Sequence, residues 1–207
     1  LTAASNSASL LGLGEDELMG LTYRLGEAAR SVDPSLELVI GISQPWGEYL
    51  IPAERPSPFS FADHLIRSGL SIGSLDLEVC MGVGGRGSWC RDPLDLSRLL
   101  DLYALLGVPL SVTLGYPSSQ RPDPNADPEL VVGAGHWRTG FNAESQRDWA
   151  GAFASLALCK PYVQQVKWTH LSDAHPHQFP NSGLFGRDGT AQPALEVLRE
   201  LRGRHLR

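Results

Sequence analysis

The sequence predicts an α/β domain built on a parallel sheet, because segments typical of strands alternate strictly with segments typical of helices along the 207 residues. Clear apolar strands begin near positions 36, 75, 109 and 163. Such alternation fits either a doubly wound sheet or a (β/α)8 barrel. The barrel is favoured because no glycine-rich dinucleotide fingerprint follows a strand. In addition, the long aromatic loops all come after strand ends, where barrel enzymes build their sites.

The first half of the chain is expected to contain two helices and two strands. Acids at 15–17 lie at the positive end of a helix that Asp33-Pro34 ends. Its apolar positions recur at helical spacing: Leu18, Leu21, Leu25 and Ala28. A strand is expected over 36–42, a helix over 60–67 and a second strand over 75–83. The second helix should turn Phe61, Leu65 and Ile66 inward.

The second half continues the alternation. A helix over 92–106 is expected to begin at Asp92-Pro93, and Gly107 caps it. Its apolar stripe consists of Leu96, Leu99, Leu100 and Tyr103. A strand over 109–114, a loop of about 25 residues, a helix over 144–158, a strand over 163–169 and a final helix over 194–202 follow.

Composition excludes several classes of protein. A net charge of -6 leaves no basic stripe for nucleic acid, and no apolar run approaches the ~18 residues of a membrane span. No G-x-S-x-G elbow supports a serine hydrolase. The cysteines at 80, 90 and 159 lack metal-binding spacing, and we expect buried free thiols. A bond between the first two would require their loop to fold back.

The end of the chain resembles clan A glycoside hydrolases, nearest the family-10 xylanase type. "VKWTHLSD" (166–173) is similar to their Trp-bearing eighth strand, and "GLFGRDGTAQPALEVLREL" (183–201) is similar to their usual ending. The resemblance covers essentially all of 1–207 and implies one partial domain. That domain is the C-terminal half of a (β/α)8 TIM barrel, strands four/five to eight, with the N-terminal half of the barrel missing. We therefore expect a chain that begins inside a domain.

The resemblance also implies where the catalytic glutamates should stand. In those enzymes an acid/base follows an Asn at the end of strand four, and a nucleophile follows a Thr at the end of strand seven. Here Asn6 is followed by Ser7, and Thr113 is followed by Leu114. No acid lies between residues 101 and 123. The usual retaining mechanism is therefore not expected.

Two other glutamates are the candidate catalytic residues. Along 75–83 the apolar residues should face the helices, while Asp76, Glu78 and Cys80 should face the barrel lumen. Glu78 is then either catalytic or a structural carboxylate bound to backbone or to Lys167. Glu48 follows the strand at 36–42 and is either catalytic or a loop carboxylate that pairs with an Arg.

Polar and aromatic residues after the strands are the candidate carbohydrate contacts. They are Asn6, Gln44, Trp46, Tyr49, Tyr116, His136, Trp137, Trp168, His170 and Asp173. The resemblance implies that Trp168 forms the floor of a sugar subsite; the alternative is core packing. His136 and Trp137 are either a sugar platform or a loop anchor.

A metal site was weighed on His175 and His177, which lie close to Asp173. A lone H-x-H without a third ligand is a weak signal, so we expect no metal and no cofactor.

The resemblance therefore implies a glycoside-hydrolase-like protein that acts on or binds a carbohydrate ligand at the C-terminal mouth. The alternative is a non-catalytic carbohydrate-binding pseudoenzyme, and a third interpretation is an α/β domain with an unrelated small ligand. The residues assign no compartment, although the resemblance is compatible with an extracytoplasmic one. In a parallel barrel, Trp46 and Trp168 should lie at the same end of the sheet.

Overall fold

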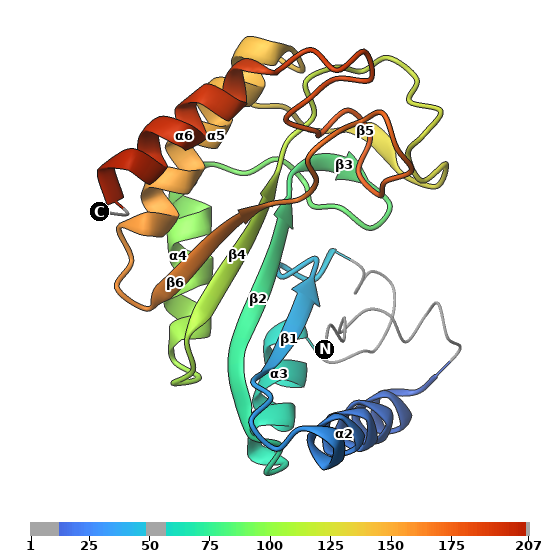
Figure 1. Ribbon diagram of the computed structural model, residues 1–207, viewed down its shortest axis with the longest axis vertical. Coiled ribbons are helices and arrows are strands. Elements are labelled where there is room, and N and C mark those ends of the chain that lie inside the picture. The colour runs from blue at the N-terminus through green and yellow to red at the C-terminus, as the bar shows by residue number, and fades with distance from the viewer. Residues whose placement is uncertain (1–12, 49–56, 206–207) are drawn as a thin grey trace.

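The computed structural model describes residues 13–48 and 57–205, and its centre is a four-stranded parallel sheet (Figure 1). Its strands lie in the order β1 (Leu38–Ser43), β2 (Ile72–Cys80), β4 (Leu110–Gly115) and β6 (Val163–Trp168). Each strand runs parallel to its neighbour. The strands follow one another across the sheet in the order of the sequence, as in a barrel wall. In a doubly wound sheet this order reverses. The predicted α/β fold with part of a barrel is confirmed.

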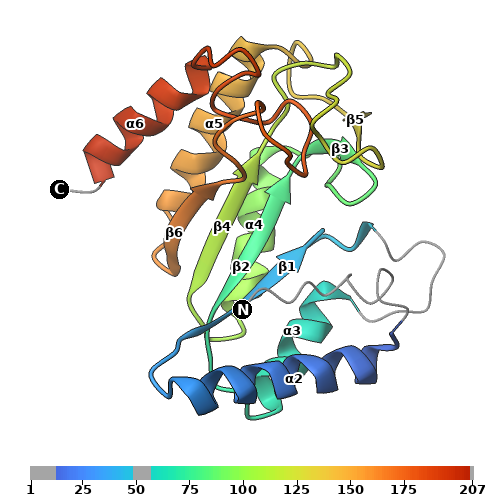
Figure 2. The ribbon, with the colours of Figure 1, turned by 45° about the vertical axis from the view of Figure 1, so that its right-hand side comes forward.

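Five helices belong to the described residues: α2 (Glu15–Val32), α3 (Pro58–Arg67), α4 (Pro93–Ala104), α5 (Ala143–Leu158) and α6 (Pro193–His205). Three of them begin at a residue whose side chain accepts a backbone N–H of the first turn: Ser57, Asp92 and Asn142. Figures 1 and 2 show α3 and α4 behind the sheet, and α2 crossing below it. The helices thus cover one face of the strands.

The main core lies between the sheet and these helices. Leu75, Leu77 and Val79 of β2 are fully buried there, and β4 adds Val112 and Leu114. The helices contribute the residues expected from their spacing and two large aromatics: Phe61, Leu65, Leu96, Leu100, Tyr103, Trp149 and Phe153. The predicted alternation of β2 is confirmed, because every second residue enters this core.

The strand expected over 75–83 is divided in two. β2 starts at Ile72 and ends at Cys80, and a separate strand β3 (Gly82–Gly84) follows, because Gly82 has a φ of +80° that turns the chain. β3 pairs antiparallel with β5 (Val131–Ala134), which lies in the loop that was expected to be irregular. A small second sheet therefore stands beyond the end of β2 (Figure 1).

Helix α2 buries a different face from the expected one. Leu18 is buried, but Leu25 is 46% exposed and Ala28 is exposed. The buried turn contains Gly26, where an added Cβ would lie 2.7 Å from a methyl group of Leu70. The helix therefore approaches its neighbours at Gly26, which directs Leu25 away from them.

The cysteine and membrane predictions can also be compared with the structure. All three cysteines are free, but only Cys80 is buried; Cys90 is half-buried and Cys159 is exposed. The expectation of buried thiols was therefore wrong for Cys159. Among the described residues, no helix combines the length and the apolar character that crossing a membrane would require.

Candidate functional site

The face of the sheet opposite the main core carries a polar network centred on Asp76. Its carboxylate accepts hydrogen bonds from Ser111 Oγ at 3.0 Å and Thr113 Oγ1 at 3.0 Å, and it pairs with Lys167 Nζ at 2.6 Å. These four residues come from β2, β4 and β6, so their side chains meet across three neighbouring strands. This is the lumen face that the alternation of β2 predicted.

Glu78 lies on the same face, two residues closer to the C-terminal end of β2. Burial, followed by the negative charge of Asp76, raises the pKa of its carboxyl group to about 7, although the charge of Arg86 acts in the opposite direction. Lys167, considered as one partner of a structural Glu78, pairs with Asp76 instead. Glu78 is therefore a buried carboxyl group on the lumen face whose pKa is raised to about 7.

Gln44 organises the loop beside Glu78. Its side-chain amide donates to the carbonyl oxygens of Gly85 at 3.0 Å and Gly87 at 2.8 Å. Gln44 is only 4% exposed. The sequence suggested a direct contact with a sugar hydroxyl. Instead, this amide holds the turn that contains Arg86, whose charge acts on Glu78.

Glu48 and Trp46 both contact Arg91. Glu48 Oε1 accepts from Arg91 Nη1 at 2.5 Å and from the backbone N–H of Trp89 at 3.3 Å, and its side chain is 8% exposed. The Arg91 guanidinium also lies 4.6 Å from the centre of the Trp46 ring. Of the two roles left open for Glu48, the geometry corresponds to the loop carboxylate paired with an Arg.

Tyr116 lies in the core and not at a ligand surface. It is fully buried, and its ring stacks on Phe141 at 5.3 Å and on Trp149 at 5.4 Å. Its hydroxyl donates to the Gly140 carbonyl at 3.2 Å and accepts the Trp137 N–H at 2.8 Å. Tyr116 therefore fixes the long loop to α5, and its expected place among the carbohydrate contacts is corrected.

Trp168 faces the helices as well. It stands opposite Leu114 in the register of β4 and β6, and Leu114 belongs to the main core. The indole meets Trp149 edge-on at 6.2 Å and donates to the Ser182 carbonyl at 2.7 Å. Of the two roles left open for Trp168, these contacts correspond to core packing and not to the floor of a sugar subsite.

His136 and Trp137 follow β5 in the long loop. Trp137 packs edge-on against Phe153 at 5.3 Å and is half-buried, while His136 is exposed. The Arg138 guanidinium lies 5.2 Å from the centre of the Trp137 ring. Trp137 thus has the contacts of a loop anchor, and His136 is the more accessible of the two.

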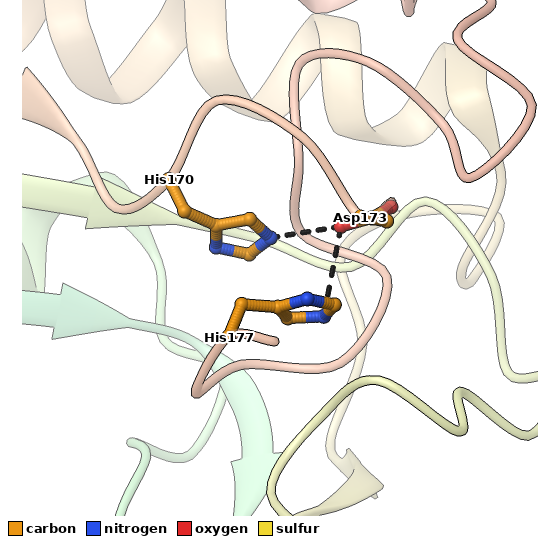
Figure 3. A group of neighbouring side chains, drawn as sticks. All are labelled: His170, Asp173 and His177. Carbon is orange, nitrogen blue, oxygen red and sulfur yellow. Dashed lines mark hydrogen bonds and ion pairs between the residues drawn. The ribbon is translucent and has the colours of Figure 1, made fainter. Parts of the chain in front are cut away.

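His170 and Asp173 belong to a cluster with His177 (Figure 3). Asp173 Oδ1 lies 2.8 Å from His170 Nε2 and 3.8 Å from His177 Nε2. His177 Nε2 also lies 3.1 Å from Asp123 Oδ2, in the loop after β4. Sequence reasoning paired His175 with His177; the structure brings His170 and Asp123 to His177 instead. Residues 170–177 form turns and not a helix, so no regular spacing marks this cluster in the sequence.

A cavity of about 840 Å³ opens between the loops after β4 and β6, next to the start of α5. Asp123 and Asp173 form part of its wall. Its other polar walls include Ser118, Arg121, Asn142 and Arg187. Polar groups of this kind can hydrogen-bond the hydroxyls of a sugar.

Trp46 and Trp168 lie at the same end of the sheet, as expected for parallel strands. Trp46 follows β1 and Trp168 ends β6, and the strands of this sheet are parallel. Asn6 and Tyr49 lie outside the described residues. Of the described candidates, Glu78 lies on the lumen face, whereas Tyr116 and Trp168 do not.

No family model matches the sequence, and no curated protein matches it. Solved structures do match the fold. Xylanase 10B from Thermotoga maritima has a TM-score of 0.61 and 12% identity, covering 99% of this chain and 59% of that chain. A family-10 glycoside hydrolase from Paenibacillus barcinonensis has a TM-score of 0.59 and 18% identity, covering 90% and 51%.

A β-glucuronidase also matches the fold. Bifidobacterium dentium β-glucuronidase, solved with coumarin-3-O-glucuronide, has a TM-score of 0.57 and 16% identity, covering 87% of this chain and 26% of that chain. The chain thus spans well under two thirds of the chains it matches. At these identities the likeness shows the fold, which is that of part of a glycoside-hydrolase TIM barrel.

Proposed function

We propose that this protein binds a carbohydrate at the C-terminal mouth of the barrel and that Glu78 is the proton donor of that site. The position of Glu78 carries the proposal: it lies on the lumen face near the strand end, with a pKa of about 7. A general acid of a glycosidase must hold a proton at working pH, which an ordinary carboxyl group does not do.

The ligand class is supported by the structures that share the fold. A xylanase from Thermotoga petrophila was solved with xylobiose, and one from Thermoanaerobacterium saccharolyticum with xylotetraose. A carbohydrate is the common ligand of these barrels, so an oligosaccharide is the first ligand to test on this chain.

Two carboxyl groups in contrasting environments support the chemical part of the proposal. Asp76 accepts hydrogen bonds from two hydroxyls and an ammonium, whereas Glu78 is buried and its pKa is raised to about 7. A glycosidase uses two carboxyl groups in different roles, one of which must hold a proton. Glu78 would then protonate the leaving oxygen of a glycosidic bond.

A specific observation favours the second candidate, non-catalytic carbohydrate binding. Hydrolysis needs a nucleophile or a base opposite the acid. Leu114 stands where the resemblance places the nucleophile, and it is buried in the main core. Glu48 is held by Arg91 and Asp76 by Lys167. Glu48 and Asp76 thus already have cationic partners.

The experiment compares Glu78→Gln with the unaltered protein in two assays. Oligosaccharide binding is measured by calorimetry, and aryl-glycoside hydrolysis is measured across pH 4–9. We expect Glu78→Gln to lower hydrolysis at least ~100-fold while binding stays within about threefold, because the amide keeps the shape of the acid. Glu27→Gln on the exposed surface of α2 is the matched control.

Each outcome separates the candidates. Binding without hydrolysis by the unaltered protein would support the second candidate. Hydrolysis that survives Glu78→Gln would exclude Glu78 as the acid. Failure to bind any xylo-, gluco- or glucurono-oligosaccharide would contradict the whole proposal.

A further inference from the structure

Two carboxylates and two imidazoles are buried together where the loops after β4 and β6 meet. The exposed fractions of their side chains are 2% for Asp123, 7% for Asp173, 4% for His177 and 15% for His170. Within the described residues, neither aspartate pairs with a Lys or an Arg. Two negative charges are therefore buried with only histidines to balance them, which is costly unless a cation is present.

The hydrogen bonds of His177 show where that cation belongs. Its Nδ1 lies 2.7 Å from the carbonyl oxygen of His175, which can only accept, so Nδ1 carries a hydrogen. In the neutral imidazole, Nε2 is then a lone pair. That lone pair faces Asp123 Oδ2 at 3.1 Å and Asp173 Oδ1 at 3.8 Å. Acceptors cannot bond one another, so a positive ion must lie between them: a metal ion or a second proton.

We propose that this cluster is a binding site for a divalent transition metal ion of the Zn²⁺ type. Its ligands are His177 Nε2, Asp173, Asp123 and His170 Nε2. Donor atoms of His170, Asp173 and His177 all lie within 4.8 Å of one another. In a tetrahedral site with bonds of about 2.0–2.2 Å, donor atoms are separated by roughly 3.3–3.5 Å. A 2+ ion balances two carboxylates, and imidazole ligands select zinc over calcium or magnesium.

The rings must adjust to receive the ion. Their centres lie 4.4 Å apart and their planes differ by 19°, whereas a metal lies close to the plane of each imidazole that binds it. His170 is the ring that can tilt, because its Nδ1 is buried without a hydrogen-bond partner among the described residues. Figure 3 shows both rings directing a nitrogen toward Asp173. His170 Nε2 donates to Asp173 Oδ1 without the ion, so binding requires that this hydrogen move to Nδ1 and leave the lone pair of Nε2 for the metal.

The surroundings suit a structural metal. Backbone N–H groups fix both carboxylates, from Gly183 to Asp173 Oδ1 at 2.8 Å and from Asn181 to Asp123 Oδ2 at 2.9 Å. Asp123 and Asp173 line the 840 Å³ cavity, which provides the path of entry. Asp123 lies in the loop after β4 and the other three ligands in the loop after β6, so a bound ion would join the two loops. This site is independent of Glu78.

The test uses zinc alone as the probe. The protein is treated with EDTA, dialysed and titrated with ZnCl₂ by calorimetry, and bound zinc is counted by mass spectrometry. We expect one zinc per chain, unaffected by excess MgCl₂ or CaCl₂, and a rise in Tm on zinc binding. His177→Gln should lower the affinity for zinc at least ~10-fold and abolish the rise in Tm. His175→Gln is the matched control, because its side chain is exposed and the substitution keeps the backbone carbonyl.

Two results would overturn the proposal. One is a folded protein that binds no stoichiometric zinc, with stability that changes with pH through His177; a proton would then be the cation. The other is equal loss of zinc in His175→Gln and His177→Gln. Where His177→Gln does not fold, His170→Gln and Asp123→Asn give the same comparison with the control.

Discussion

The two faces of the parallel sheet differ in almost every physical respect, although their residues alternate along the same strands. On β2, Leu75, Leu77 and Val79 are fully buried against the helices, while Asp76 and Glu78 between them face the lumen. One face is held by apolar packing, and the other by hydrogen bonds and an ion pair. Strand alternation therefore separates the residues that stabilise the barrel from those that can do chemistry.

The largest expected effect on stability comes from a substitution on the helix-facing side of the sheet. Leu77→Ala removes a fully buried side chain from the main core and should lower the free energy of unfolding by about 2–5 kcal/mol. Ser111→Ala on the lumen face removes one hydrogen bond to Asp76 and should cost about 0.5–1.5 kcal/mol. Urea unfolding followed by circular dichroism measures both. Equal losses would contradict the division between the faces.

A pH effect should arise from the lumen face. The pKa of Glu78 is about 7 in the folded protein against 4.5 for an ordinary glutamate, so the folded state holds the proton more tightly. The stability from this group is complete below pH 4.5 and is lost as pH rises through 7. The difference amounts to about 3 kcal/mol. In Glu78→Gln, the free energy of unfolding should depend less on pH between 4.5 and 7. The same pH dependence in this variant and in the unaltered protein would exclude the raised pKa.

The two tryptophans at the strand ends should separate stability from binding. Trp168→Ala should lower unfolding free energy by roughly 2–3 kcal/mol, less than a fully buried Trp because the ring is only partly buried, with oligosaccharide affinity unchanged. Trp46→Ala should weaken oligosaccharide binding by about 1–2 kcal/mol. Calorimetry and urea unfolding on both variants give the comparison. Weaker oligosaccharide binding by Trp168→Ala, with unchanged stability, would instead show that Trp168 contacts the ligand.

The smallest expected effect lies within the lumen face. Asp76→Asn removes the second cause of the raised pKa of Glu78 and leaves the first, which is burial. The pKa of Glu78 should therefore fall without returning to 4.5. Carbon-13 NMR of labelled glutamate measures this change. A pKa that does not move would show that Asp76 and Glu78 do not interact.

The local sequence pattern predicted those helices and strands whose apolar residues recur at regular spacing. The stripe of α4 and the alternation of β2 are both confirmed, because each depends only on periodicity within one segment. The side on which Trp168 lies depends on register with β4, and the sequence alone does not give that register. The small sheet of β3 and β5 joins segments about 50 residues apart, and no local signal announces such a pairing.

The candidate site was predictable to a similar degree. The alternation of residues along β2 is enough to place Glu78 on the lumen face. The contact between His177 and Asp123 was not foreseen, because the two residues are 54 positions apart and belong to loops after different strands. The role of Gln44 was missed for the same reason, since its partners lie in the loop after β2. Long-range contacts between loops decide which polar residues remain accessible to a ligand.

The most direct test of the account is the titration of the Glu78 carboxyl group by carbon-13 NMR, with and without a saturating xylo-oligosaccharide. The account predicts a pKa of about 7 in the free protein and a clear change in pKa when the oligosaccharide binds. Glu78→Gln identifies the resonance. A carboxyl group that titrates near 4.5 and does not respond to the oligosaccharide would contradict the assignment of the lumen face as the carbohydrate site.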